Sequence, residues 1–204
     1  MQTKKLRKYD SLIAWSGGVE STALIVWALD KGYTPLCYHV TAGWDERTGR
    51  EQAAIQTMKQ LLNVDCLNVE NVAHGPITYN ETAGTTHTYD FDFWMYWGLK
   101  LFTVNEGFTE LWYGNNNGRD VSGDGKGDKT SDCFLKCKEG TILMANGLRP
   151  NRSFDITAPY EHPKMTQWDK IPDNIKPHVI SSDRHVDMST KMLYNGATDN
   201  RGTA

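Results

Sequence analysis

The sequence lacks a long hydrophobic run, which argues against an integral membrane protein. A membrane-spanning helix needs ~20 consecutive apolar residues. The longest apolar stretches, around Ile13 and Ile25, are interrupted within a few positions by Ser, Gly, Thr or Asp. We therefore expect no membrane-spanning segment and no membrane partner.

Cysteine is also scarce, and there is little net charge. Four cysteines, at positions 37, 66, 133 and 137, show no paired framework, so we expect reduced thiols and a cytoplasmic location. The 22 basic and 25 acidic residues leave a formal net charge of −3, which provides no overall positive field for nucleic acid. A basic cluster at positions 4–8 has no apolar signal core after it, and we interpret it as a solvated arm. Direct binding of nucleic acid is therefore not expected.

What is present is the composition of a soluble globular chain, with 39% hydrophobic and 23% charged residues over 204 positions. This length predicts a single domain, residues 1–204. Within it we distinguish a basic N-terminal arm (1–10), a core (11–158) and a polar C-terminal extension (159–204). In the extension, prolines punctuate the chain and apolar residues show little periodicity.

The spacing of apolar residues in the core predicts strands that alternate with helices. Strands are expected at 11–15, 34–41, 66–69, 110–113 and 154–158. Helices are expected at 21–29, 51–62, 91–102 and, with interruptions, 133–144. The polar stretches 71–89 and 114–131 read as loops. This alternation is typical of βαβ units, so the predicted fold class is α/β, a parallel sheet with flanking helices.

The most informative segment joins the first predicted strand to the first predicted helix. It reads Ser16-Gly17-Gly18-Val19-Glu20-Ser21-Thr22. Two glycines after a buried strand allow a sharp turn and a close approach to a ligand. The helix that follows directs unpaired N–H groups and the positive end of its dipole into that turn, where an anion such as a phosphate fits. A plain strand-to-helix turn with a serine cap is the alternative.

This segment is not the phosphate loop that ends in Gly-Lys-Ser/Thr, because no lysine follows the glycines. It resembles the SGGxDS loop of the ATP pyrophosphatase (PP-loop) superfamily, whose members split ATP between its α- and β-phosphates. Glu20 stands where that family usually has aspartate. The resemblance implies a Rossmann-like fold of the adenine nucleotide alpha-hydrolase type and an enzyme that uses ATP and Mg²⁺.

Further segments are similar to the 7-cyano-7-deazaguanine synthases (the QueC family). The stretch Trp44 to Glu51 matches the spacing of a YGQRHxxE motif, in which Arg47 and Glu51 are identical. A second sequence element of this family is similar to Gly114, Asp120 and the pair Asp132-Cys133. A third element is similar to the segment that contains Lys164. The end of the chain, residues 190–196, resembles the segment that opens the family's zinc site, but no cysteine is present there, so we expect no structural zinc.

The resemblance implies a ligase that adenylates a small carboxylate, releasing AMP and pyrophosphate. The substrate it implies is 7-carboxy-7-deazaguanine, converted with ammonia to the nitrile preQ0, as in queuosine biosynthesis. Catalytic roles fall on Arg47, Lys164 and Asp132. The ATP and its phosphates are assigned to Ser16, Gly17, Gly18, Val19, Glu20, Ser21, Thr22, His39, Val40 and Gly114, with Glu20 near Mg²⁺. The other substrate is assigned to Trp44, Glu51, Phe91, Asp120 and Cys133.

Several alternatives stay open on the sequence alone. The loop also suits a thiolating or sulfonucleotide-reducing enzyme, for which Cys133 is the one plausible reactive cysteine, or a non-catalytic nucleotide-binding protein. Asp120 to Gly125 copies half of a calcium loop but lacks its final glutamate, and we interpret it as a lid. Trp94 and Trp97 have helical spacing and are interpreted as core. A homodimer is an open expectation, as is a viral origin, which would place the protein in the host cytoplasm.

Overall fold

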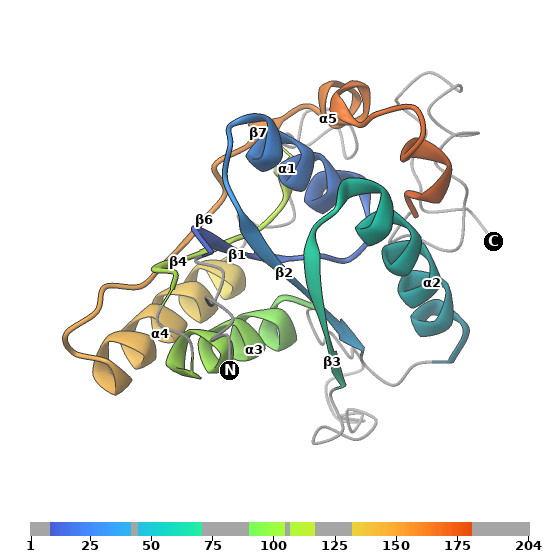
Figure 1. Ribbon diagram of the computed structural model, residues 1–204. Helices are drawn as coiled ribbons and strands as arrows, with labels where there is room; N and C mark the ends of the chain where they lie inside the picture. Colours follow the sequence, from blue (N-terminus) through green and yellow to red (C-terminus); the bar gives the residue numbers. More distant parts are fainter. Residues whose placement is uncertain (1–8, 42–44, 71–89, 105–106, 117–131, 181–204) are drawn as a thin grey trace, which may run out of the picture.

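A computed structural model of the chain describes residues 9–41, 45–70, 90–104, 107–116 and 132–180 (Figure 1). Five strands form one sheet in the order β3-β2-β1-β4-β6, and all neighbours are parallel. Their bounds are β1 Ser11–Ala14, β2 Pro35–Thr41, β3 Asp65–Glu70, β4 Glu110–Trp112 and β6 Asp155–Thr157. The predicted α/β class with a parallel sheet is confirmed.

The strand order places β1 at the centre of the sheet. In the register, Ile13 lies opposite Cys37 of β2 on one side and Trp112 of β4 on the other. The chain builds outward from β1 through β2 and β3, then crosses to the opposite side and adds β4 and β6. In doubly wound sheets of this kind, the crevice beyond the carboxyl ends of the central strands is where ligands bind.

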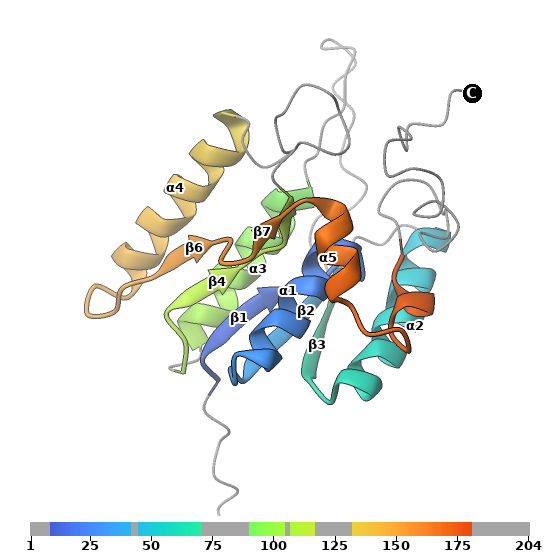
Figure 2. The same ribbon diagram turned by 90° about the horizontal axis from the view of Figure 1, so that it is seen from above.

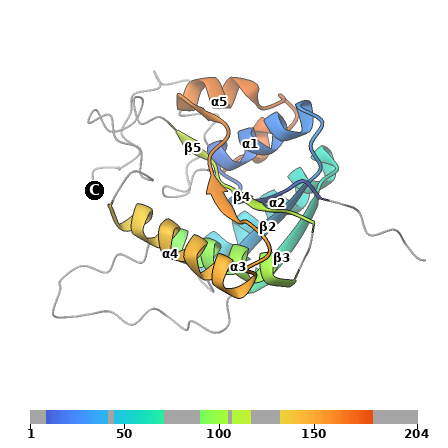
Figure 3. The ribbon, with the colours of Figure 1, turned by 90° about the vertical axis from the view of Figure 1, so that its left-hand side faces the viewer.

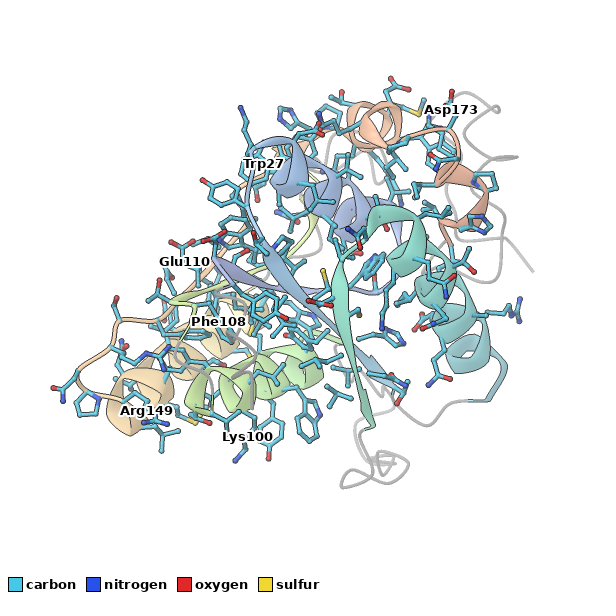
Figure 4. The ribbon with its side chains drawn as sticks, viewed as in Figure 1. Trp27, Lys100, Phe108, Glu110, Arg149 and Asp173 are labelled. Carbon is cyan, nitrogen blue, oxygen red and sulfur yellow. The ribbon has the colours of Figure 1, made fainter. Side chains whose placement is uncertain are left out.

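Helices cover both faces of the sheet, as Figure 3 shows. The bounds of the four long helices are α1 Val19–Asp30, α2 Asp45–Leu62, α3 Asp90–Val104 and α4 Asp132–Leu148. Successive residues of β1 point to opposite faces. Ile13 therefore belongs to a cluster with α1 and α2, whereas Leu12 belongs to a cluster with α3 and α4. Figure 4 shows the side chains of both clusters, with Phe108 among those of the α3 and α4 side.

The chain after residue 158 contributes to the first of these clusters. A two-residue strand, β7 (Glu161–His162), pairs with β5 (Asn115–Asn116), and α5 (Lys164–Lys170) packs on α1 (Figure 2). A turn of 3-10 helix, η2 (Lys176–His178), follows. The buried hydrophobic residues in this part of the chain are Tyr160, Trp168, Ile171, Ile175 and Val179.

Three local predictions differ from the structure. The expected loop at 114–131 contains β5 at its start, because Asn115 and Asn116 pair with β7; residues 117–131 lie outside the described residues. The helix at 132–148 is longer than expected and continuous, and α2 begins six residues before Glu51. Within the described residues, no helix is both long and apolar enough to cross a bilayer.

Candidate functional site

The glycine turn lies at the carboxyl end of β1, the central strand. The Trp15 amide donates a hydrogen bond to the Tyr38 carbonyl (2.8 Å), which continues the sheet one residue beyond β1. The Trp15 indole Nε1 then donates to Thr22 Oγ1 (3.1 Å), so the residue before the turn is connected to the first turn of α1. Gly17 has a φ of +80°, a conformation that glycine adopts without strain.

Two serine hydroxyls organise the inside of the turn. Ser16 Oγ lies 3.2 Å from Ser21 Oγ, and the Gly18 amide donates to Ser16 Oγ (3.4 Å). Ser21 Oγ donates to the Gly18 carbonyl (3.3 Å). Ser21 is buried, whereas Ser16 is exposed. The Ser16 hydroxyl is thus the part of this cluster that an incoming ligand meets first.

The first turn of α1 is suited to an anion. Its first intrahelical hydrogen bond runs from the Thr22 amide to the Gly18 carbonyl (3.0 Å), and no side chain caps the helix at Gly18. The amides of Val19, Glu20 and Ser21 precede that bond and have no acceptor within the helix. Together with the helix dipole, such amides attract negative charge.

Gly114 lies directly against this first turn. A Cβ atom added at Gly114 would sit 2.4 Å from the Glu20 carbonyl carbon and from the Ser21 amide nitrogen. Only a residue without a side chain fits there. The sequence assigned Gly114 to nucleotide binding. The structure places Gly114 where the chain after β4 meets the backbone of α1. Its contacts show that it allows these two segments to pack closely beside the loop.

Lys164 places a positive charge beside the loop. Its Nζ lies 3.5 Å from Glu20 Oε1, and both side chains are largely buried, at 12% and 21% exposure. Lys164 is the first residue of α5, which packs on α1. A residue that the sequence did not single out, Gln167, fixes this arrangement: its buried Nε2 donates to the backbone carbonyls of Asn115 and His162.

His39 lies beneath the turn. It is buried at the end of β2, and its Nδ1 donates to the Trp15 carbonyl (3.0 Å), which fixes the ring next to Ser16. Its Nε2 lies 3.8 Å from Glu51 Oε2 on α2. His39 therefore joins β2 and α2 to the backbone that leads into the loop. Val40, the next residue, is half-buried.

The outer side of the turn is covered by the chain near residue 180. The Ile180 amide donates to the Gly17 carbonyl (3.0 Å). The Ile180 side chain lies 3.2 Å from the position that a Cβ at Gly17 would occupy. No sequence pattern pointed to Ile180, because this contact joins residues far apart in the chain.

Of the sequence-predicted residues, the structure brings Ser16 to Thr22, Gly114 and Lys164 together, with His39 and Glu51 beneath them. Other assigned residues lie on described helices but without described side chains: Arg47 on α2, Phe91 on α3, and Asp132 and Cys133 on α4. Trp44, Asp120, the half calcium loop beyond it and the segment where zinc was not expected lie outside the described residues. Among the described residues there is no group of three or more His, Cys, Asp or Glu that could hold a metal.

Trp94 and Trp97 of α3 pack against the core, as predicted. The Trp94 ring stacks 5.6 Å from that of Tyr113 and lies 6.3 Å from that of Phe134. Trp97 is also partly buried against the cluster of α3 and α4.

No protein-family model matches the chain, and no curated protein matches it in sequence. The solved structures that are similar in fold include the following two. NMN synthetase from Francisella tularensis is 12% identical with a TM-score of 0.44, covering 70% of this chain and 65% of that one. U34-tRNA thiolase NcsA from Methanococcus maripaludis, with its 4Fe-4S cluster, is 14% identical with a TM-score of 0.45, covering 95% of this chain and 60% of that one. This chain thus spans less than two thirds of the length of either.

Proposed function

We propose that this protein binds ATP through the turn and first helical turn at Ser16–Thr22 and uses it to adenylate a small carboxylate. The observation that carries the proposal is the start of α1, where three amides precede the first intrahelical hydrogen bond. They lie at the carboxyl end of the central strand, beside an exposed serine hydroxyl and a lysine. Hydroxyl, amides and ammonium group are the donors that a polyphosphate requires.

Two local features of the loop support this proposal. Gly17 already has a positive φ, and no side chain caps α1. Lys164 can exchange its contact with Glu20 for one with a phosphate oxygen. Mg²⁺, when bound with ATP, neutralises phosphate charge, and Glu20 is the loop carboxylate that would hold it.

The chemistry is a displacement at the α-phosphorus. A carboxylate oxygen of the substrate attacks this atom, the bond to the pyrophosphate oxygen breaks, and an acyl adenylate forms. Ammonia then displaces AMP to give an amide. Such a reaction depends on positioning and on neutralising charge in the transition state. Lys164 is proposed to perform the second task, supported by its position beside the loop, and Arg47 and Asp132 are proposed to contribute from α2 and α4.

The identity of the carboxylate is proposed from the sequence resemblance. We infer 7-carboxy-7-deazaguanine, whose amide would be activated a second time with ATP and dehydrated to the nitrile. Trp44, Glu51, Phe91, Asp120 and Cys133 are proposed to line its site. His39 and Val40 lie at the end of β2, next to where we place the adenine.

The proposal is tested by incubating the protein with ATP, Mg²⁺, ammonia and 7-carboxy-7-deazaguanine. AMP, pyrophosphate and the nitrile are the expected products. If AMP forms only with other acceptors, the loop still uses ATP but the substrate is not this carboxylate. A thiolating enzyme would give that result. Binding of ATP without AMP formation would identify a non-catalytic nucleotide-binding protein.

A matched pair of variants ties the activity to the loop. Ser16→Ala removes the exposed hydroxyl and is expected to lower AMP formation ~10²-fold or more, as when one donor to a transition state is removed. Thr57→Ala changes a hydroxyl on α2 whose contact is with the backbone of its own helix, and it should leave AMP formation unchanged. Equal activities of the two variants would contradict the assigned site.

A further inference from the structure

The chain that follows α5 runs back to the glycine turn. We call residues 171–180 of this chain the strap, and Figure 1 shows it leading from α5 toward α2, on which η2 packs. Ile180, at the end of the strap, donates its amide to the Gly17 carbonyl (3.0 Å). The Ile180 side chain lies against the same glycine. The strap therefore contacts the backbone of the loop directly.

The strap is held in place by buried apolar side chains. Ile171, Ile175 and Val179 are only 1%, 1% and 3% exposed, in the cluster that also contains residues of α1 and α2. A turn orders the backbone between them, because the Ile175 amide donates to the Pro172 carbonyl (2.9 Å). Lifting the strap from the fold would expose all three apolar side chains to water, which is unfavourable. The strap therefore holds the Ile180 amide in a fixed position.

The hydrogen bond from Ile180 fixes one peptide group of the loop. The Gly17 carbonyl and the Gly18 amide belong to the same peptide group, and no peptide bond among the described residues is cis. In a trans peptide the C=O and the N–H point in opposite directions. With its carbonyl held by Ile180, this group turns the Gly18 amide toward Ser16 Oγ (3.4 Å). The exposed Ser16 hydroxyl is where we place the phosphates of ATP.

This peptide group needs such an anchor, because a glycine stands on each side of it. Gly17 has a φ of +80°, and neither Gly17 nor Gly18 has a Cβ atom that would oppose rotation of the group between them. A rotation by half a turn would direct the Gly17 carbonyl toward the phosphates, and its partial negative charge would repel them. Loops in that state would not bind ATP, so the measured affinity would fall with their population.

We propose that Ile180 is a positioning residue for ATP: its main-chain amide holds the Gly17–Gly18 peptide group with the N–H directed toward the phosphates. This inference rests on the proposed function, because it assumes that the loop binds a nucleotide. It assigns the role to the amide of Ile180 and not to its side chain. Coupling between two events is reciprocal. ATP should therefore stabilise the docked strap by the same factor by which the docked strap strengthens ATP binding.

A pair of substitutions at one position separates the amide from the side chain. Ile180→Pro removes the amide hydrogen, and Val179 before it is extended (φ −72°, ψ 128°), as a following proline requires. Ile180→Val keeps the amide and is close to proline in size. In isothermal titration calorimetry with ATP and Mg²⁺, Ile180→Pro should weaken binding about 5- to 10-fold, whereas Ile180→Val should stay within about twofold of the unaltered protein. Equal affinities of the two variants, both shown to be folded by circular dichroism, would overturn the inference.

Hydrogen exchange of the unaltered chain, followed by NMR, tests the reciprocal effect and decides alone if Ile180→Pro does not fold. Saturating ATP and Mg²⁺ should slow exchange of the Ile180 amide about 5- to 10-fold. The Arg152 amide, which donates to the Arg149 carbonyl (2.9 Å) in the turn after α4, is the control and should not change. Unchanged exchange at Ile180 would show that the strap and the nucleotide are independent. Faster exchange would show that they compete, and either result would overturn the inference.

Failure of this inference can be told apart from failure of the proposed function. If the unaltered protein binds no ATP, both are wrong. If it binds ATP but exchange at Ile180 does not slow, or if Ile180→Pro binds as tightly as Ile180→Val, the loop retains its proposed role and only the role of Ile180 is wrong.

Discussion

Lys164 Nζ lies 3.5 Å from Glu20 Oε1, and this contact joins the start of α5 to the first turn of α1. A lysine beside a helix amino terminus is unfavourable alone, because both are positive. The Glu20 carboxylate balances that charge when no anion is bound. A phosphate would take over the same task, so Glu20 and the ligand compete for one ammonium group.

This competition gives the first prediction. Glu20→Gln removes the negative charge, so ATP without Mg²⁺ should bind about 5- to 10-fold more tightly by isothermal titration calorimetry. Lys164→Met should weaken ATP binding and reduce AMP formation ~10²–10³-fold. Lys164→Arg keeps the positive charge, so its ATP binding and AMP formation should be closer to those of the unaltered protein. Weaker binding by Glu20→Gln in the absence of Mg²⁺ would show that its carboxylate does not compete with phosphate.

Gly114 gives the second prediction, through a steric contact. Its substitution by Ala would bring a methyl group to 2.4 Å from backbone atoms of Glu20 and Ser21, which cannot move aside as a flexible side chain could. We expect Gly114→Ala to lower the free energy of unfolding by about 3 kcal/mol in urea titrations. ATP binding should fall as well, because the displaced backbone carries the amides of the loop.

Gly49→Ala is the control for this change. Gly49 is exposed within α2, and an added Cβ meets nothing within 4 Å. Alanine there should raise the free energy of unfolding by about 0.5–1 kcal/mol, through helix propensity. If Gly114→Ala and Gly49→Ala have similar free energies of unfolding, the backbone of the first turn of α1 can accommodate a methyl group at Gly114.

The loop and the sheet could be predicted from sequence because their signals are local. The two glycines follow an apolar strand directly and precede an apolar helix, so Gly17 could be placed at a turn without knowledge of the rest of the chain. The same holds for β1 to β3, whose strands and helices alternate at short range. Predicted bounds at these elements differ from the structure by a few residues, with α2 the exception.

The part of the site contributed by residues 159–180 was not predictable in the same way. Helix α5 has seven residues and buries a glutamine, so it carries no hydrophobic periodicity. The structural role of Gln167 depends on its hydrogen bonds to the carbonyls of Asn115 and His162, which only the folded chain brings within reach. The contact of Ile180 with Gly17 likewise has no local signature. Lys164 was identified only through resemblance to a known family.

Gln167 gives the third prediction. Gln167→Met keeps the volume of the side chain but removes the two donors, and leaves the carbonyls of Asn115 and His162 short of a hydrogen bond. We expect the free energy of unfolding to fall by about 2–3 kcal/mol. Gln56→Met, on the exposed side of α2, should change it by less than about 0.5 kcal/mol.

A second measurement separates a local role of Gln167 from a general one. Because Gln167 joins β5 to the residues just before Lys164, its loss should also weaken ATP binding at a temperature where the variant is fully folded. Unchanged affinity in the folded variant would restrict Gln167 to stability. A stability equal to that of Gln56→Met would contradict the importance of its hydrogen bonds.

The fourth prediction concerns two thiols on neighbouring strands, Cys37 of β2 and Cys66 of β3, which lie opposite each other in the register. Burial raises the pKa of Cys66 from its ordinary value of 9.0 to about 12, and it raises the pKa of Cys37 well above that ordinary value. Thiolates are the reactive form. Neither cysteine should therefore react readily with iodoacetamide at about pH 8.5 until the chain is unfolded.

The same shift makes stability depend on pH in a defined direction. The folded chain holds the thiol proton more tightly than the unfolded chain, so the stabilisation is complete below pH 9 and is lost as the pH rises from 9 toward 12. Urea titrations at about pH 8 and pH 10.5 should show a smaller loss for Cys66→Ala than for the unaltered protein. Buried tyrosines titrate alike in both proteins and cancel in this comparison. Equal losses would mean that the Cys66 thiol ionises as easily in the folded chain as in the unfolded one.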